Sequence, residues 1–254
     1  MPAKGVMDTT LQAPSISAPA SVEIERVTRR FGAVTALEGL SLRADEHEVV
    51  CVVGPSGCGK STLLELVCGL QAADAGTVAG PPAVYMPQRD LLLPWWGALD
   101  NAALPLRVAG QSRAAARAHA QPLFAELGLA GFERARPDAL SGGMRQRVAF
   151  LRTLLSGKPV LALDEPFAAL DALTRAEVQR WLEQALARAP RTVLLVTHDV
   201  EEAVVLGDRV VVLSPRPGRV VAELAIELPR PRRRTDPAVG ALRERALAAM
   251  GVPA

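Results

Sequence analysis

The chain has 254 residues, which is enough for one large domain or for a domain with a subdomain. Its formal net charge is only +2, so its composition provides no strong basic field and predicts no nucleic-acid partner. No apolar run approaches the roughly 20 residues that cross a bilayer, and no signal peptide is recognisable. If the protein serves membrane transport, another chain must form the pore.

The first segment, residues 1–20, is rich in Ala, Pro, Ser and Thr and is predicted to be a disordered tail. None of the three cysteines belongs to a C-x-x-C pair, which predicts reduced thiols in a cytosolic protein. Of these cysteines, Cys58 lies inside a glycine-rich loop. There it either acts as a redox switch or fills a permissive position.

Short apolar runs alternate with helical patterns, which predicts an α/β fold with a largely parallel sheet. The first two runs, Val22–Val27 and Leu40–Ala44, alternate between apolar and polar residues and predict strands of an antiparallel flank. The later runs are short and apolar, as buried parallel strands are. They are Val49–Val53, Val84–Met86, Val160–Leu163, Val193–Val196 and Val210–Leu213.

The stretch Gly54–Ser61 follows one of these strands and precedes a predicted helix, Lys60–Leu70. It has the pattern G-x-x-x-x-G-K-S, whose glycines let backbone N–H groups turn onto phosphates at a helix N-terminus. Lys60 is expected to reach the β- and γ-phosphates, and the Ser61 hydroxyl to hold Mg²⁺. The alternative is a glycine-rich turn that only caps a helix. The predicted nucleotide-binding residues here are Gly54, Pro55, Ser56, Gly57, Cys58, Gly59, Lys60, Ser61 and Thr62.

Residues 91–157 are rich in Ala, Leu and Arg and predict a helical subdomain inserted into the α/β core. A helix is expected over Ser112–Leu127, with Ser112 as its N-cap and Pro122 kinking or splitting it. Further along, Leu140–Arg147 places Ser141 and two glycines before another helix, which predicts a second anion-binding nest. One chain has no use for two nests so far apart. In a head-to-tail pair, each nest could close on the partner's nucleotide.

Two predicted strands end in residues suited to phosphate chemistry. Asp164 lies at the carboxyl end of its strand, where it could hold Mg²⁺, and Glu165 could orient and deprotonate an attacking water. Taken alone, the pair could be a helix cap. His198 ends the next strand and is either a γ-phosphate contact or an ordinary polar residue.

The C-terminal segment is Pro/Arg-rich and then helical over Ala241–Met250. Its basic run, Arg230–Arg234, is predicted to be a solvated linker, with contact to lipid phosphates as the alternative. The expected limits are residues 21–228 for the main domain and residues 229–254 for a short C-terminal extension.

Taken in order, these motifs resemble those of the ATPase subunits of ATP-binding cassette (ABC) transporters, over residues 22–228. Gly54–Ser61 matches the Walker A motif, Leu140–Met144 the signature, and Val160–Glu165 the Walker B motif. The resemblance implies a P-loop NTPase (RecA-like) core with an antiparallel β flank and an inserted helical subdomain. It implies ATP, sandwiched in a homodimer, and Mg²⁺. The residues it adds to the site are Phe31 (adenine stacking), Gln88 (nucleotide and metal), Ser141, Gly142, Gly143, Met144 and Asp171, with His198 as the switch histidine.

The segment Met86–Trp95, together with the signature and Asp164–Arg175, is similar to the nitrate/sulfonate/taurine importer subfamily and to its thiamine pyrimidine precursor branch. The resemblance implies an ATPase on the cytoplasmic face of the cell membrane. There it would act with permease subunits and, through them, with a solute-binding protein. Trp95 and Trp96 either anchor a permease helix or pack inside the helical subdomain. The alternative function is a soluble single-cassette ATPase not involved in transport.

Overall fold

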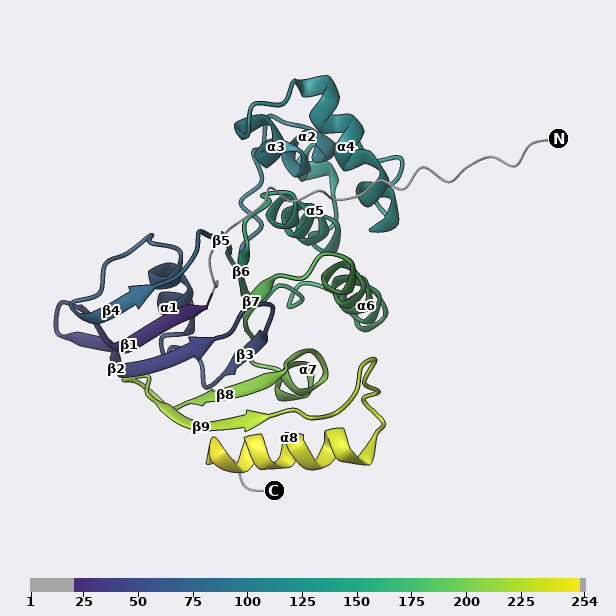
Figure 1. The fold of residues 1–254 in the computed structure, drawn as a ribbon. Helices are drawn as coiled ribbons and strands as arrows, with labels where there is room; N and C mark the ends of the chain where they lie inside the picture. Colours follow the sequence, from purple (N-terminus) through teal and green to yellow (C-terminus); the bar gives the residue numbers. More distant parts are fainter. Residues whose placement is uncertain (1–20, 252–254) are drawn as a thin grey trace.

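The computed structural model describes residues 21–251, and the predicted tail over residues 1–20 lies outside them. Two sheets form the scaffold (Figure 1). The smaller one is antiparallel, in the order β2-β1-β4, and consists of β1 (Val22–Phe31), β2 (Val34–Ala44) and β4 (Ala75–Ala79). It is the predicted antiparallel flank.

The larger sheet has the order β5-β6-β7-β3-β8-β9. Its first five strands in this order are parallel, and β9 is an antiparallel strand at the edge. Every residue of β3, β6 and β7 is buried, as their continuous apolar sequences require. Because these strands run the same way, their carboxyl ends meet at one edge. The bounds are β3 Val49–Val53, β5 Ala83–Met86, β6 Val160–Asp164, β7 Thr192–Val196, β8 Arg209–Leu213 and β9 Val220–Ala225.

Helices cover this sheet, and a separate group lies beyond one end of it (Figure 1). In that group α2, α3 and α4 gather away from the sheet, with α5 between them and the strands. The indole N–H of Trp181 in α6 donates to Glu126 in α4 (3.0 Å), and its ring packs against Phe150 of α5. The helices are α1 Lys60–Val67, α2 Ala98–Ala102, α3 Leu104–Val108, α4 Arg113–Glu126, the 3₁₀ turn Pro137–Ala139, α5 Gly142–Leu154, α6 Ala172–Arg188, α7 Val200–Leu206 and α8 Pro237–Ala249. None of them has the length and apolar character needed to span a bilayer.

Several local predictions need correction. Helix α4 begins after Ser112, whose hydroxyl accepts from the N–H of Ala115 (3.2 Å), but it runs through Pro122 without splitting. Helix α1 ends at Val67 rather than Leu70, since Gly69 takes a positive φ of 66°. The final helix begins at Pro237, four residues earlier than expected, with Asp236 as its N-cap.

The prediction of a solvated linker over Arg230–Arg234 is wrong. Arg232 donates to main-chain carbonyls at the end of α7, including Val204 (3.0 Å) and Val205 (3.1 Å). Arg230 forms an ion pair with Asp208 (2.5 Å). The run satisfies carbonyls that the helix leaves without partners, and it ties the C-terminal segment to the core.

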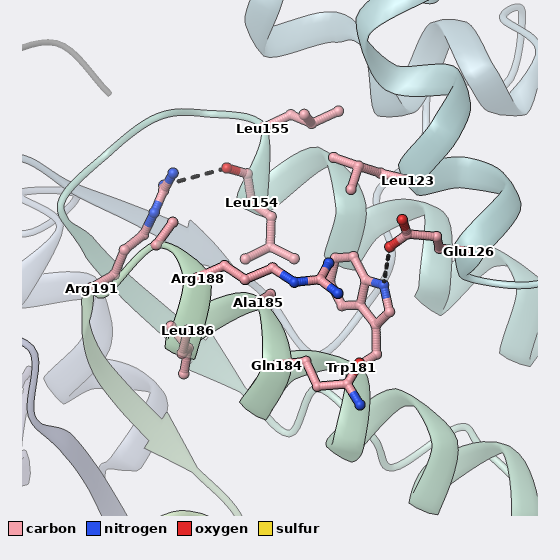
Figure 2. A pocket seen from close by; sticks show the side chains of 11 residues that line it. Leu123, Glu126, Leu154, Leu155, Trp181, Gln184, Ala185, Leu186, Arg188 and Arg191 are labelled. Carbon is pink, nitrogen blue, oxygen red and sulfur yellow. Dashed lines mark hydrogen bonds between the residues drawn. The ribbon is translucent and has the colours of Figure 1, made fainter. Parts of the chain in front are cut away.

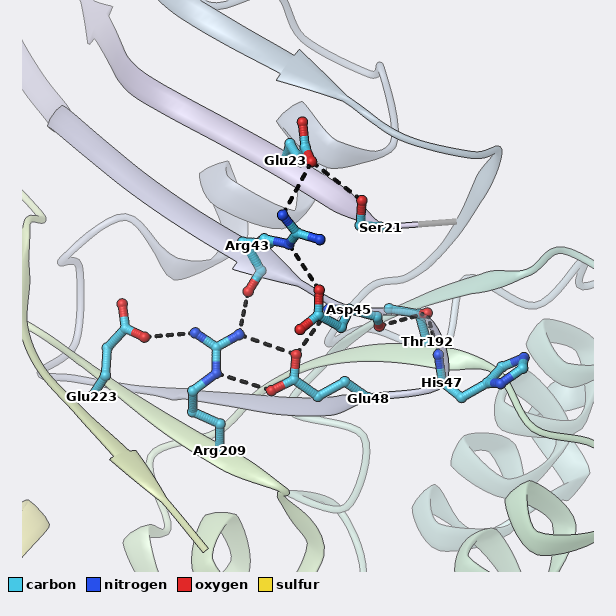
Figure 3. Close-up of polar contacts among 9 residues, drawn as sticks. All are labelled: Ser21, Glu23, Arg43, Asp45, His47, Glu48, Thr192, Arg209 and Glu223. Carbon is cyan, nitrogen blue, oxygen red and sulfur yellow. Dashed lines mark hydrogen bonds and ion pairs between the residues drawn. The ribbon is translucent and has the colours of Figure 1, made fainter. Parts of the chain in front are cut away.

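A network of ion pairs joins the two sheets (Figure 3). Arg209 of β8 makes a two-pronged contact with Glu48, at 2.9 and 3.1 Å, and an ion pair with Glu223 (2.6 Å). It also donates to the main-chain carbonyl of Arg43 in β2. The hydrogen bonds to Glu48 and Glu223 and the negative charges of these residues raise the pKa of the Arg209 guanidinium above its usual value. A single side chain therefore connects β8, β9 and the antiparallel flank.

Arg209→Ala is expected to lower the free energy of unfolding by about 2–3 kcal/mol, because it leaves the largely buried Glu48 carboxylate without its partner. Urea unfolding followed by circular dichroism would measure this. Arg43→Ala is the control, since the Arg43 side chain is 64% exposed and solvent screening should leave its ion pairs little effect on the free energy of unfolding. Equal losses in the two variants would contradict the role given to Arg209.

Candidate nucleotide-binding site

A polar cavity of about 500 Å³ lies at the carboxyl edge of the core sheet beside the glycine-rich loop. Most of its lining was predicted from the sequence: Phe31, Ser56, Gly57, Gly59, Lys60, Ser61, Thr62, Gln88, Asp164 and Glu165. Val34, Ala36 and Arg216 complete it and were not predicted. The segments that supply these residues are far apart in the sequence, and the sheet edge brings them together.

The loop from Gly54 to Gly59 depends on glycine at two positions. Gly57 and Gly59 have φ values of +76° and +105°, which a residue with a side chain rarely adopts. A Cβ on Gly59 would lie only 2.6 Å from the Leu37 side chain, because the loop passes directly over β2. Helix α1 begins immediately afterwards, so its N-terminus points into the cavity region. The loop therefore has the shape and dipole of an anion cradle.

Lys60 is buried, with only 8% of its surface exposed. Its ammonium donates to the main-chain carbonyls of Gly54 (2.7 Å) and Pro55 (3.0 Å). These contacts hold the positive charge against the loop, where it lines the cavity. Cys58 is also buried, and burial raises the pKa of its thiol, which favours the filling role over the redox switch.

Asp164 ends β6 and is almost fully buried. Tyr85 of β5 donates its hydroxyl to Asp164 Oδ2 at 2.9 Å, which orients the carboxylate. Burial and the negative charge of Asp164 raise the pKa of Tyr85, so its phenol stays protonated and remains a donor. Sequence reasoning missed Tyr85. Its position in a strand paired in parallel with β6 was the available signal.

Glu165 lies between two other predicted site residues. Its Oε2 accepts a hydrogen bond from the amide nitrogen of Gln88 (3.1 Å) and lies 3.2 Å from Nδ1 of His198. Glu165 has a φ of 47°, an uncommon conformation for a residue with a side chain, which is held by a main-chain bond to Val196 (2.9 Å). His198 is 65% exposed while Glu165 is mostly buried. A residue with a strained backbone thus places its carboxylate against two polar partners at the cavity edge.

A buried network supports the loop that carries His198. Thr197 donates its hydroxyl to Glu202 (2.6 Å), and Gln179 of α6 donates its amide to the same carboxyl group (2.9 Å). Burial raises the pKa of Glu202. Asp199 caps α7 by accepting from the N–H of Glu202 (3.0 Å). Nothing in the sequence pattern pointed to this support, because its members come from three separate elements.

The remaining predicted residues do not line this cavity. Ser141 caps α5 by accepting from the N–H of Met144 (3.2 Å), and Asp171 caps α6 through Leu173 and Thr174 (3.1 Å each). Ser141 and Gly142 are exposed at the start of α5, followed by the half-buried Gly143 and Met144. The second nest therefore faces outward.

A second cavity, of about 60 Å³, lies between α4, α5 and α6 (Figure 2). Apolar side chains such as Leu123 and Leu154 dominate its lining. Arg191 lies on one side of the cavity. Its guanidinium donates to the main-chain carbonyls of Leu154 (3.3 Å) and Lys158 (2.9 Å), so these N–H groups already have partners. This cavity is too small and too apolar for a nucleotide.

A phosphate-binding loop that opens a helix, at the edge of a parallel sheet beside an Asp-Glu pair, defines a P-loop nucleotide-binding ATPase. The chain belongs to the ABC transporter family, whose family profile matches residues 37–168. It is 47% identical over 184 residues to the formylaminopyrimidine import ATP-binding protein ThiZ of Halalkalibacterium halodurans, covering 71% of this chain and 74% of that protein. It is 41% identical to the aliphatic sulfonates import ATP-binding protein SsuB 2 of Burkholderia cenocepacia, covering 90% and 86%.

A third relative is the taurine import ATP-binding protein TauB of Burkholderia thailandensis, 44% identical over 79% of this chain and 81% of that protein. Among solved structures, the dimeric bacterial ABC transporter cassette MJ0796 has a TM-score of 0.75 at 28% identity. The match spans 82% of this chain and 99% of the MJ0796 chain. The same cassette in a post-hydrolysis state bound to ADP and Pi matches equally well, at 29% identity. These findings confirm the predicted fold class, the nitrate/sulfonate/taurine subfamily and the ATP-binding ATPase assignment.

Proposed function

We propose that this chain hydrolyses ATP to power the import of a small solute through a separate membrane permease. The observation that carries the proposal is the position of Glu165, at the edge of the loop-lined cavity and in contact with Gln88 and His198. That is where a base acting on water near a terminal phosphate must lie. Titration of the purified chain with ATP, followed by release of phosphate, tests it. A chain that binds no ATP would contradict it.

Several polar groups of the cavity, together with His198 beside Glu165, have roles in this reaction. Lys60 and the loop N–H groups bind the phosphates, and the exposed ring of Phe31 stacks on the adenine. Glu165 orients water and takes its proton, while His198 and Gln88 position that carboxylate and contact the terminal phosphate.

The oxygen donors of the cavity also fit Mg²⁺. Ser61, Gln88 and Asp164 would hold the ion, since hydroxyl, amide and carboxylate oxygens are the ligands that it prefers. Gln88 uses its amide nitrogen for Glu165, which leaves its oxygen for the cation. Residues 21–251 contain no cluster of three His, Cys, Asp or Glu side chains that could hold a metal by themselves. When bound, the ion would neutralise phosphate charge.

A homodimer would complete the site. The nest begins at the exposed Ser141 and, like Asp171, lies outside the cavity of its own chain. In a head-to-tail pair each nest would close on the partner's ATP, and loss of the terminal phosphate would remove the bridge. The similarity to a dimeric cassette supports this arrangement.

The segment after Gln88 is the proposed permease contact. Leu91 and Trp95 are 61% and 65% exposed, which favours docking over packing inside the helical group. Trp96 instead packs against Arg107, whose guanidinium carbon lies 4.8 Å from the centroid of the Trp96 ring. Two arginines of α5 hold the segment: Arg145 pairs with Asp90 (3.0 Å), and Arg152 donates to the carbonyls of residues 90 and 91. Movement of α5 would therefore carry the exposed side chains with it.

Trp95→Ala is expected to lower solute uptake at least about tenfold while leaving ATP hydrolysis by the purified chain unchanged, because a buried aromatic anchor typically contributes about 2 kcal/mol or more to an interface. Uptake by cells and phosphate release by the purified chain would both be measured. Val108→Ala, which also removes a highly exposed apolar side chain, is the control. Normal uptake in the Trp95 variant would exclude this residue as the anchor.

We further propose the cytoplasmic face of the membrane as the place of action and a solute-binding protein as the partner that supplies cargo. The proposed cargo is a solute of the sulfonate, nitrate, taurine or thiamine-precursor class. The relatives, which are named as import proteins for formylaminopyrimidine, aliphatic sulfonates and taurine, support this range. The division into a main domain over residues 21–228, with helices inserted over 91–157, and an extension over 229–254 stays a prediction. A single-cassette ATPase outside transport remains the alternative, and it predicts unchanged uptake.

A further inference from the structure

Arg216 lies in the turn between β8 and β9, more than 150 residues after the glycine-rich loop, yet it lines the same cavity. Its Nε donates to the main-chain carbonyl of Gly57 at 2.9 Å. The guanidinium is so close that a Cβ on Gly57 would stand 2.9 Å from Arg216 Nη2. The absence of a side chain at Gly57 thus lets this cation rest against the phosphate-binding loop.

No carboxylate within residues 21–251 forms an ion pair with Arg216. In the same part of the chain, its one side-chain hydrogen bond is the one to Gly57. Arg219, in the same turn, differs because it pairs with Glu38. Arginine carries five N–H donors in a planar fork, so the four on the terminal nitrogens of Arg216 are available to a ligand.

We propose that Arg216 is a second nucleotide-binding cation, beside Lys60, which contacts the phosphate chain of the bound nucleotide. Gly57 belongs to the loop whose N–H groups would cradle those phosphates, and a guanidinium fork matches phosphate oxygens. The inference rests on the proposed function, because it requires that the cavity binds ATP. A purely structural role would instead be to hold the loop through the Gly57 carbonyl.

Two variants separate these roles. Arg216→Gln keeps N–H donors for the Gly57 carbonyl but loses the charge, and Arg216→Lys keeps the charge but loses the fork. Arg219→Gln is the matched control, in the same turn but outside the cavity. Each purified chain would compete against a fluorescent ATP analogue with ATP, ADP and adenosine, while circular dichroism verifies the fold.

The expected result is that Arg216→Gln raises the Kd for ATP about tenfold, the effect of one charge-assisted contact. The Kd for adenosine should stay unchanged, and Arg216→Lys should recover part of the ATP affinity. An unchanged Kd for ATP in Arg216→Gln, an equal loss for adenosine, or a lysine variant as weak as the glutamine variant would overturn the inference. If the wild-type chain bound no ATP, the proposed function itself would fail.

Discussion

Glu165→Gln is expected to lower ATP turnover by about 10²–10⁴-fold while leaving ATP binding intact. Glutamine has the size of glutamate and can still accept a hydrogen bond from Gln88, but it cannot take a proton from water. The substitution removes the negative charge of the carboxylate whose Oε2 lies against both Gln88 and His198. The loop, Lys60 and Ser61, which are expected to bind the phosphates, would be untouched.

Phosphate release under saturating ATP measures the turnover, and nucleotide titration verifies the binding. Glu244→Gln is the control, because Glu244 is an exposed residue of α8, paired only with its neighbour Arg243. It should hydrolyse ATP at the wild-type rate. Normal turnover in Glu165→Gln would remove Glu165 from the role of base, and loss of ATP binding would show that the variant had damaged the site.

Ser141→Arg is expected to abolish ATP-dependent dimerisation, and turnover with it, while leaving nucleotide binding by the single chain intact. Ser141 lies outside the cavity of its own chain, at the exposed N-terminus of α5. An arginine there would fill the space that the partner's nucleotide must enter. Because ligand shared by two chains stabilises only the paired state, blocking one nest removes that stabilisation.

The association is best followed by analytical ultracentrifugation with ATP, in a Glu165→Gln background that is expected to retain the nucleotide. Ser112→Arg is the matched control, since Ser112 caps α4 as Ser141 caps α5 and belongs neither to the glycine-rich loop nor to the cavity lining. Both variants lose a helix cap, which typically costs about 1 kcal/mol. Only Ser141→Arg should stay monomeric. A dimer that forms in that variant would contradict the shared site.

Much of the core could be predicted from the sequence because its signals are local. The strand Val49–Val53, for example, is uniformly apolar and buried, and the loop after it needs only its own residues to define an anion cradle. In contrast, β4 was missed because almost all of its side chains are exposed, which leaves no apolar face to recognise. The burial of β9 does alternate, but its outward positions include Val221 and Ala225, so its sequence does not alternate between apolar and polar residues.

The parts of the site that were missed depend on contacts between distant segments. Tyr85 orients Asp164 from a neighbouring strand, and Arg216 reaches Gly57 from a turn near the end of the domain. The role of Arg230–Arg234 was also misjudged, since the carbonyls that these side chains satisfy lie on another helix. Periodicity and motif spacing carry no information on such pairings, which depend on the folded arrangement.

ATP hydrolysis at Glu165 is expected to power solute import. The most direct test is the uptake of labelled alkylsulfonate, taurine and formylaminopyrimidine by cells whose only copy of this chain is either wild type or Glu165→Gln. The predicted result is selective loss of uptake of one of these solutes in the variant, which would also name the cargo class. Equal uptake of all three by both cell lines would contradict an import function for these cargo classes and favour an ATPase that acts outside transport.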